Sequence, residues 1–415
     1  MRRARTAVVL AVLLLAASPL TARDLEITFW HSMGYHVRET IDRMTADFNR
    51  AHPGIRVKPV YQGFFEDVQV KMLAAAVSRQ LPDVAHVPLE FLQPYVDNRL
   101  VEPITGSIPE HDLHDIIPQA WEAVSRDGEI YGVPFCFTTD VLFYNADAFR
   151  EVGLSPDSPP DTWEELVEQG KRLTRDTDGD GRPDTYAMMF YLNGFYGLMP
   201  ILWSNGGELF TGGGLVDLTS RPMRRSVRMV HELLFTHRIM PRQWTPWESG
   251  QAFLSGNLAM GWFTSAAISY GERNLPWELR VAHMPSINGE RATMLGGAAL
   301  VNFARNRKKR QAVQEFALWF AEKENMIRLF EEVGFVPVRR SALDSLQVRS
   351  FIRKNPNYRV PLEALEYARH LPRHAQFYKI NREFGEMLQR IVLQGTDPEE
   401  ELRRTEARIN RMLRE

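Results

Sequence analysis

The first part of the chain alternates between strand-like and helix-like spacing of its apolar residues. Residues 25–30 alternate apolar and polar side chains, and residues 55–60 repeat this pattern, which is typical of half-buried strands. Between and after these segments, apolar side chains recur every three or four residues over 37–48 and 66–79, as on one face of a helix. A short apolar run at 84–87 predicts a buried strand. Strands that alternate with helices predict an α/β lobe with a mainly parallel sheet.

Later segments continue the mixed pattern. Residues 131–149 have strand character, and the region from about 160 to 290 mixes helical and strand spacing. Thr162 is followed three residues later by Glu165, which predicts a helix that begins with a capping box. The sequence also predicts a Gly-rich strand at 296–301 and one long amphipathic helix at 310–332. A charged C-terminal helix is predicted to begin at Pro398.

Ligands of α/β folds gather where the strands end. Because the carboxyl ends of parallel strands share one edge of the sheet, we expect a binding region next to three segments. These segments are Trp30-His31-Ser32, Gly63-Phe64-Phe65-Glu66 and Leu89-Glu90.

Residues 1–22 have the pattern of a secretory signal. Three arginines within the first five residues precede an unbroken apolar run from Ala7 to Ala17, which Ser18-Pro19 ends. The run is shorter than the roughly 20 residues that a membrane-spanning helix needs. Since no cysteine follows it to carry a lipid, we expect an untethered mature protein in a bacterial periplasm.

The overall composition favours a soluble, two-lobed protein. A chain of 415 residues is too long for one compact core of ordinary size. A net charge of -2 argues against a nucleic-acid partner, which would favour a basic face. The single cysteine, Cys136, cannot form a disulfide within the chain, and its position between two Phe residues favours an inert buried thiol.

Several ordered motifs resemble those of a known family. They are Phe29-Trp30-His31-Ser32-Met33, Tyr61-Gln62-Gly63, Pro134-Phe135, the run from Val141 to Phe149, Pro159-Pro160-Asp161-Thr162-Trp163, Gly256-Asn257-Leu258, Gly296-Gly297 and Gly334-Phe335-Val336-Pro337. In this order they resemble the family 1 extracellular solute-binding proteins of ABC importers. Within that family the chain is most similar in appearance to the sn-glycerol-3-phosphate-binding periplasmic proteins.

The resemblance implies a fold of two α/β lobes, of the type II periplasmic-binding-protein kind, joined by crossing hinge segments with a ligand cleft between them. It implies an N-terminal lobe of residues 23–137 plus about 291–340, and a C-terminal lobe of residues 138–290 plus about 341–415. It also implies a monomer that closes on its ligand and docks on a membrane permease. A ligand shifts such an equilibrium only by its preference for the closed form.

The resemblance also implies a set of ligand-binding residues. Phe65 and Phe335 stand where the glycerol-phosphate binders have Tyr, so two hydroxyl groups are absent. Arg373 matches an arginine that grips phosphate, which guanidinium groups do in a bidentate fork. The remaining candidates are a carboxylate, hydroxyl side chains and a glycine pair whose backbone N–H groups can approach an anion: Glu90, Thr138, Thr139, Thr264, Ser265, Gly296 and Gly297. Further stacking candidates are Trp30, Trp203, Trp244, Trp247 and Trp262, of which we expect about half to be buried framework.

One motif is independent of the resemblance. Asp176, Asp178, Asp180 and Asp184 occupy positions 1, 3, 5 and 9 of a pattern that resembles a calcium loop, with Gly181 at position 6. Position 12 is Ala187 instead of an acidic residue, so the loop is incomplete unless a distant carboxylate joins it. The alternative is a turn built from residues that favour turns. A calcium ion there would be structural, and no cofactor is required for binding.

Two ligand classes and one rival activity follow from these features. Arg373 and the Gly296-Gly297 pair favour sn-glycerol 3-phosphate or a related glycerophosphodiester. The two Phe residues and the many Trp residues favour a mono- or oligosaccharide. An exported glycoside hydrolase would need a pair of catalytic carboxylates, to which Glu90 could belong. The chain has no Gly-x-Ser-x-Gly or His-Glu-x-x-His motif, so we expect binding without catalysis.

Overall fold

The computed structural model describes residues 24–63, 65–192, 194–242 and 246–415. The predicted leader, residues 1–22, and Trp244 lie outside the described residues, as do the side chains of Phe65 and Trp247. In the described part, no helix combines the length and the apolar character that crossing a membrane requires.

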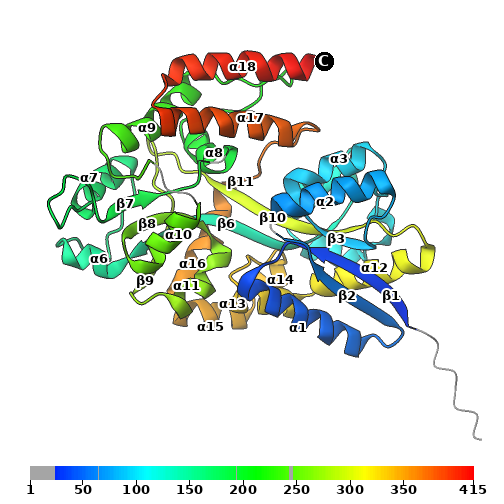
Figure 1. The fold of residues 1–415 in the computed structure, drawn as a ribbon. Coiled ribbons are helices and arrows are strands. Elements are labelled where there is room, and N and C mark those ends of the chain that lie inside the picture. Colours follow the sequence, from blue (N-terminus) through cyan, green and yellow to red (C-terminus); the bar gives the residue numbers. More distant parts are fainter. Residues whose placement is uncertain (1–23, 64, 193, 243–245) are drawn as a thin grey trace, which may run out of the picture.

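One continuous sheet runs through both halves of the described chain (Figure 1). Its strand order is β2-β1-β3-β10-β6-β8-β7, with β11 beside β10 and β9 beside β6. The strands are β1 (Leu25–His31), β2 (Ile55–Tyr61), β3 (Val84–Pro88), β6 (Val133–Asn145), β7 (Tyr186–Met189), β8 (Leu258–Thr264), β9 (Leu279–Ala282), β10 (Thr293–Asn302) and β11 (Ala368–Arg369). A separate hairpin joins β4 (Ser125–Arg126) to β5 (Glu129–Ile130).

Strand direction changes where the chain crosses between the halves. β1 lies parallel to β2 and β3, as the alternating pattern predicts. β10 lies antiparallel to both β3 and β6, and β6 lies antiparallel to β8. The prediction of a mainly parallel sheet is therefore right for the first three strands and wrong for the crossing strands. The 13-residue strand β6 is long enough to serve both halves, and Figure 1 shows β6 and β10 running between them.

Two separate apolar cores define two lobes. The first contains Phe29, Phe316 and Phe320, whose rings meet edge to face, Phe29 to Phe316 at 5.4 Å between centroids. The second contains Phe195 and Phe384, stacked at 4.3 Å. Around the first core lie α1 (Tyr35–Ala51), α2 (Phe65–Ser78), the 3-10 turn η1 (Leu89–Phe91), α3 (Leu92–Asp97), α4 (Glu110–Asp115), α5 (Pro118–Ala123) and α12 (Arg307–Phe320).

The second lobe is richer in helices. They are α6 (Ala146–Glu151), α7 (Trp163–Leu173), α8 (Phe195–Ser204), α9 (Arg221–Phe235), α10 (Pro246–Ser255), α11 (Ile268–Asn274), α15 (Leu346–Lys354), α16 (Arg359–Glu363), α17 (Phe377–Gln389) and α18 (Pro398–Arg414). The capping box that Thr162 and Glu165 predict is present at the start of α7. The Asp397 side chain caps α18, which begins at Pro398 as the sequence predicts.

The single helix expected over 310–332 is wrong, because the segment forms two helices. α12 ends at Phe320, and α13 (Lys323–Glu332) begins after Glu322, which has extended backbone angles. Both halves keep the same apolar period, so the pattern does not reveal the break. The break lets α13 contribute Met326 to the core of the first lobe and Phe330 to the core of the second. α14 (Arg340–Leu343) follows it.

We propose the lobe boundaries already inferred, residues 23–137 with about 291–340 and residues 138–290 with about 341–415. The two apolar clusters support this division, since the first draws its members from Ile27 to Phe137 and from Leu295 to Val338. α13 contributes side chains to both cores, as the crossing strands β6 and β10 also do, which suits a hinge.

Candidate functional site

Glu90 lies where the two lobes meet. It belongs to the turn η1, directly after β3, at the carboxyl end of the parallel strands. Pro88 of β3 pairs with Ala298 of β10, so the chain beyond Pro88 continues toward Gly296. Burial raises the pKa of the Glu90 carboxyl, and the hydrogen bond from Tyr196 partly opposes this effect. Glu90 is thus a carboxyl group whose neutral form is favoured more than usual.

Tyr196 brings a hydroxyl group to Glu90 from the other lobe. The residue is in the first turn of α8, which packs against β10. Its hydroxyl donates a hydrogen bond to Oε1 of Glu90. Nearby, the rings of Phe91 and Phe377 meet edge to face, 6.3 Å apart, and also join the two lobes. The lobes therefore contact each other directly at the end of β3.

The candidates Thr138 and Gly296 lie side by side on the crossing strands. Thr138 of β6 pairs with Gly296 of β10, and a Cβ on Gly296 would lie 2.9 Å from Oγ1 of Thr138. Gly297 has a φ of 147°, and a Cβ there would lie 2.3 Å from the carbonyl oxygen of Cys136. The close approach of the β6 and β10 backbones therefore requires glycine at position 297, whether or not Gly297 also binds a ligand.

Asp140 adds a second carboxyl group to this region. Side chains alternate along a strand, so Asp140 lies on the same face of β6 as Thr138. It pairs with the candidate Thr264, an exposed residue at the end of β8. Burial raises the pKa of the Asp140 carboxyl to about 7. Among the described residues, none forms an ion pair or hydrogen bond with its carboxylate.

Three other candidates are engaged in structural contacts. The Thr139 hydroxyl lies on the opposite face of β6 and donates to the carbonyl of Pro361, at 3.2 Å. The Ser265 hydroxyl is fully buried and donates to the carbonyl of Gly334, at 3.0 Å. Phe335 is a member of the first core. Thr139 thus links β6 to α16, and Ser265 links the end of β8 to the segment after α13.

Arg373 lies on the surface at the lobe junction. Its Nη1 donates to the carbonyl oxygens of Glu122 and Ser125, at 3.0 and 2.7 Å. Glu122 is in the last turn of α5 and Ser125 lies just beyond it, where cationic side chains commonly satisfy unpaired acceptors. Arg373 thus links the segment after β11 to the first lobe, and Nε and Nη2 form no further bond within the described part.

The described Trp candidates divide between framework and partly exposed positions. Trp203 and Trp262 are buried in the core of the second lobe, and Trp262 stacks on Phe190 at 4.2 Å. Trp30 is half-buried beside the first core. Cys136 is buried, and burial raises the pKa of its thiol, in agreement with an inert role.

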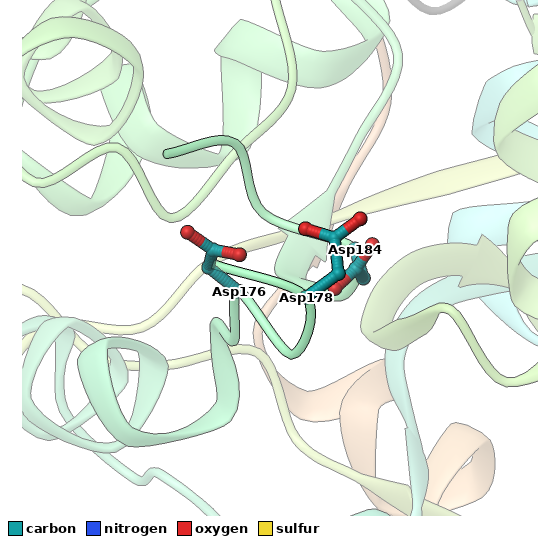
Figure 2. Close-up of side chains that lie close together, drawn as sticks. All are labelled: Asp176, Asp178 and Asp184. Carbon is teal, nitrogen blue, oxygen red and sulfur yellow. The ribbon is translucent and has the colours of Figure 1, made fainter. Parts of the chain in front are cut away.

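Three of the four loop aspartates converge (Figure 2). Asp176, Asp178 and Asp184 each place a carboxylate oxygen within 4.8 Å of the others, and all three are exposed. Asp180 lies outside this group, and its Oδ1 accepts the Arg182 N–H at 2.7 Å. Asp176 also accepts two backbone N–H groups, from Gly179 and Gly181. The same carboxylates therefore shape the turn and offer oxygen ligands of the type that calcium binds.

Sequence reasoning missed Tyr196 and Asp140. Tyr196 has no local motif, because its contact with Glu90 joins residues 106 positions apart. The sequence does contain a sign of Asp140, because this is the one charged residue in the mostly apolar strand β6.

These features define a two-lobed binding protein of the type II periplasmic class, with two apolar cores and one helix-flanked sheet whose strands cross between the lobes. Solved structures confirm this fold. A maltose/maltodextrin-binding domain of Bdellovibrio bacteriovorus bound to maltotriose matches with a TM-score of 0.83, 18% identity, and coverage of 94% of this chain and 100% of that chain. UgpB of Mycobacterium tuberculosis in complex with glycerophosphocholine matches with a TM-score of 0.83, 21% identity, and coverage of 94% and 99%.

Residues 43–358 match the family model of the bacterial extracellular solute-binding proteins, and the chain belongs to this family. The chain is 24% identical over 353 residues to the sn-glycerol-3-phosphate-binding periplasmic protein UgpB of Escherichia coli (strain K12). This alignment covers 80% of this chain and 78% of that relative. The family resemblance seen in the sequence is therefore confirmed.

Proposed function

We propose that the protein is the substrate-binding component of an ABC importer. In this proposal it is exported to the periplasm as a monomer, takes up a small solute between its lobes and delivers it to an inner-membrane permease. It catalyses no reaction and requires no cofactor. Membership of the solute-binding family supports the binding role.

Glu90 is the observation that carries the proposal. It is a buried carboxyl group at the end of β3, and it already accepts a hydroxyl hydrogen bond from the opposite lobe. A ligand hydroxyl can take the place of the Tyr196 phenol and would then be held by one lobe while the other closes over it. Such a contact couples ligand binding to the position of the lobes, because the ligand replaces the hydrogen bond that joins them at Glu90.

The ligand that we propose is sn-glycerol 3-phosphate or a related glycerophosphodiester. Its glycerol hydroxyls would bind Glu90, and its phosphate would lie near the backbone of Gly296 and the remaining N–H groups of Arg373. The E. coli relative supports this choice, since it is named for sn-glycerol 3-phosphate. The remaining candidates are retained, with Thr139 and Ser265 acting through their hydrogen bonds to the carbonyls of Pro361 and Gly334. They are Phe65, Thr138, Thr139, Thr264, Ser265, Gly297 and Phe335.

A neutral saccharide is the second candidate, and Asp140 favours it. Two carboxyl groups, Glu90 and Asp140, lie near the junction, and neither forms an ion pair with a described residue. A phosphate dianion next to ionised carboxylates is repelled, whereas sugar hydroxyls donate to them. The maltotriose-bound neighbour is consistent with this alternative at the level of the fold.

Calorimetric titration distinguishes these candidates. The ligands are sn-glycerol 3-phosphate, glycerophosphocholine and maltotriose, each added to the wild type, to Glu90→Gln and to Arg373→Gln. A phosphate ligand should lose about 2 kcal/mol or more with Arg373→Gln, the scale for removing a charged partner. Maltotriose should bind both Arg373 forms alike and lose affinity with Glu90→Gln. The proposal fails if none of the three ligands binds, or if any of them is recovered chemically changed after incubation.

A further inference from the structure

The second lobe has a groove far from the lobe junction. Its lining residues come mainly from α7 and α9. These helices lie on the side of that lobe away from β1, β2 and β3 (Figure 1). Its volume is about 840 Å³, which is within the range of about 300–1,000 Å³ of small-molecule sites. Trp163, Val167 and Met229 form an apolar floor, and Trp163 and Met229 are almost fully buried.

Four arginines line this groove from one face of α9. Arg221, Arg224, Arg225 and Arg228 are spaced by three or four residues, so they form a continuous stripe along the helix. Like charges at this spacing destabilise a helix unless anions lie nearby. The opposite face of α9 packs its apolar side chains into the core of the second lobe, and this packing stabilises the helix.

The protein supplies too few carboxylates for these arginines. Arg224 and Arg228 share one partner, Glu399, at 2.6 and 3.4 Å. Arg225 donates to the neutral amide of Asn288, at 3.0 Å, and no described carboxylate pairs with Arg225 or Arg221. Glu164 and Glu232 are the acidic residues of the lining. Together with Glu399 they make three carboxylates beside four guanidinium groups.

Other features of the groove also favour negative charge. The N-terminus of α9, a helix of 15 residues, lies at the Arg221 end, and its dipole adds partial positive charge. Burial, together with the nearby Lys171, lowers the pKa of His237, which lines the other end. Lys171 adds a further cation close by.

We propose that this groove is a second binding site, which takes a small polyanion bearing several phosphate or sulfate groups. Arg221 and Arg225, one helical turn apart, bind its anionic groups through bidentate guanidinium contacts. The apolar floor takes the body of the ligand. The site is independent of the solute that binds between the lobes, and neither Glu90 nor Arg373 belongs to it.

The test titrates the full-length mature protein with two probes, phytate for phosphate and sucrose octasulfate for sulfate. The test variant is Arg221→Gln/Arg225→Gln, and the matched control is Arg353→Gln/Lys354→Gln on α15, where both side chains are exposed and lack described ion pairs. We expect at least one probe to bind the wild type and the control alike, and the test variant about tenfold more weakly or worse. Binding should weaken with added salt.

Two results would overturn the proposal. One is the absence of binding by both probes at low salt. The other is an equal loss in the test and control variants, which would indicate attraction by overall charge alone. The single variants Arg221→Gln and Arg225→Gln, checked for unchanged thermal melting, keep the test valid if the double variant folds poorly. A change of solute affinity in the lobe junction is not expected in any of them.

Discussion

The Tyr196 hydroxyl donates a hydrogen bond to Oε1 of Glu90 across the junction of the two lobes. The first prediction concerns this bond. Tyr196→Phe leaves the Glu90 carboxyl buried without its donor wherever the two lobes are in contact, at a cost of about 1–3 kcal/mol. We expect the ligand-free variant to populate a more open form, with a larger radius of gyration in small-angle X-ray scattering. Ligand should return it to the wild-type value.

Tyr378→Phe is the matched control for this experiment, because the Tyr378 side chain is exposed on α17 of the same lobe. It should leave the scattering profile unchanged with and without ligand. A ligand-free Tyr196→Phe protein as compact as the wild type would show that the Glu90–Tyr196 bond does not hold the lobes together.

A second prediction concerns Asp140 and pH. Because burial raises the pKa of its carboxyl to about 7, the folded protein binds more protons than the unfolded chain between the unfolded value near 4 and pH 7. The contribution of Asp140 to stability therefore falls as pH rises through this window and is level above it. Asp140→Asn removes this titrating group. As the pH rises to 8, the free energy of unfolding of the variant should therefore increase relative to that of the wild type, on the order of 2 kcal/mol once the partial exposure of Asp140 is allowed for.

Urea unfolding at pH 5 and pH 8 measures this difference. Asp180→Asn in the exposed loop serves as the control, and its difference from the wild type should be the same at both pH values. If the Asp140→Asn difference is also the same at both, the Asp140 carboxyl titrates normally and the proposed link with burial is wrong.

The sequence predicts local elements well and contacts between the lobes poorly. The strands β1 and β2 follow from period-two alternation, and β3 follows from a short apolar run. The start of α7 follows from Thr162 and Glu165, because local hydrogen bonds determine a capping box. The break between α12 and α13 was missed because apolar spacing continues through it. Tyr196 was missed for a different reason: its role depends on where α8 lies against Glu90, and no periodicity encodes the packing of one lobe on another.

A third prediction separates the two glycines of β10. A Cβ at Gly297 would lie 2.3 Å from a backbone carbonyl oxygen and would require a φ of 147° that Ala avoids. We expect Gly297→Ala to destabilise the protein by about 3 kcal/mol or more, since the backbones of β6 and β10 must separate. A Cβ at Gly296 comes too close only to the Thr138 hydroxyl, which can rotate, while its other neighbours lie at an ordinary 4.0 Å; Gly296→Ala should therefore cost about 1 kcal/mol. Chemical denaturation of both variants checks the order, which a reversed result would contradict.

The last prediction concerns calcium at the loop of Asp176, Asp178 and Asp184. We propose that a bound ion stiffens the turn and takes no part in solute binding, because these exposed carboxylates lie in a loop with no described contact to Glu90. At tenfold excess over its Kd, calcium would add about 1.4 kcal/mol of stability and raise Tm by about 2 °C. Asp176→Asn/Asp178→Asn should abolish the rise, whereas Asp157→Asn should retain it. If a chelator leaves Tm unchanged and calorimetry detects no calcium uptake, the three carboxylates act only as acceptors for the backbone N–H groups of the turn.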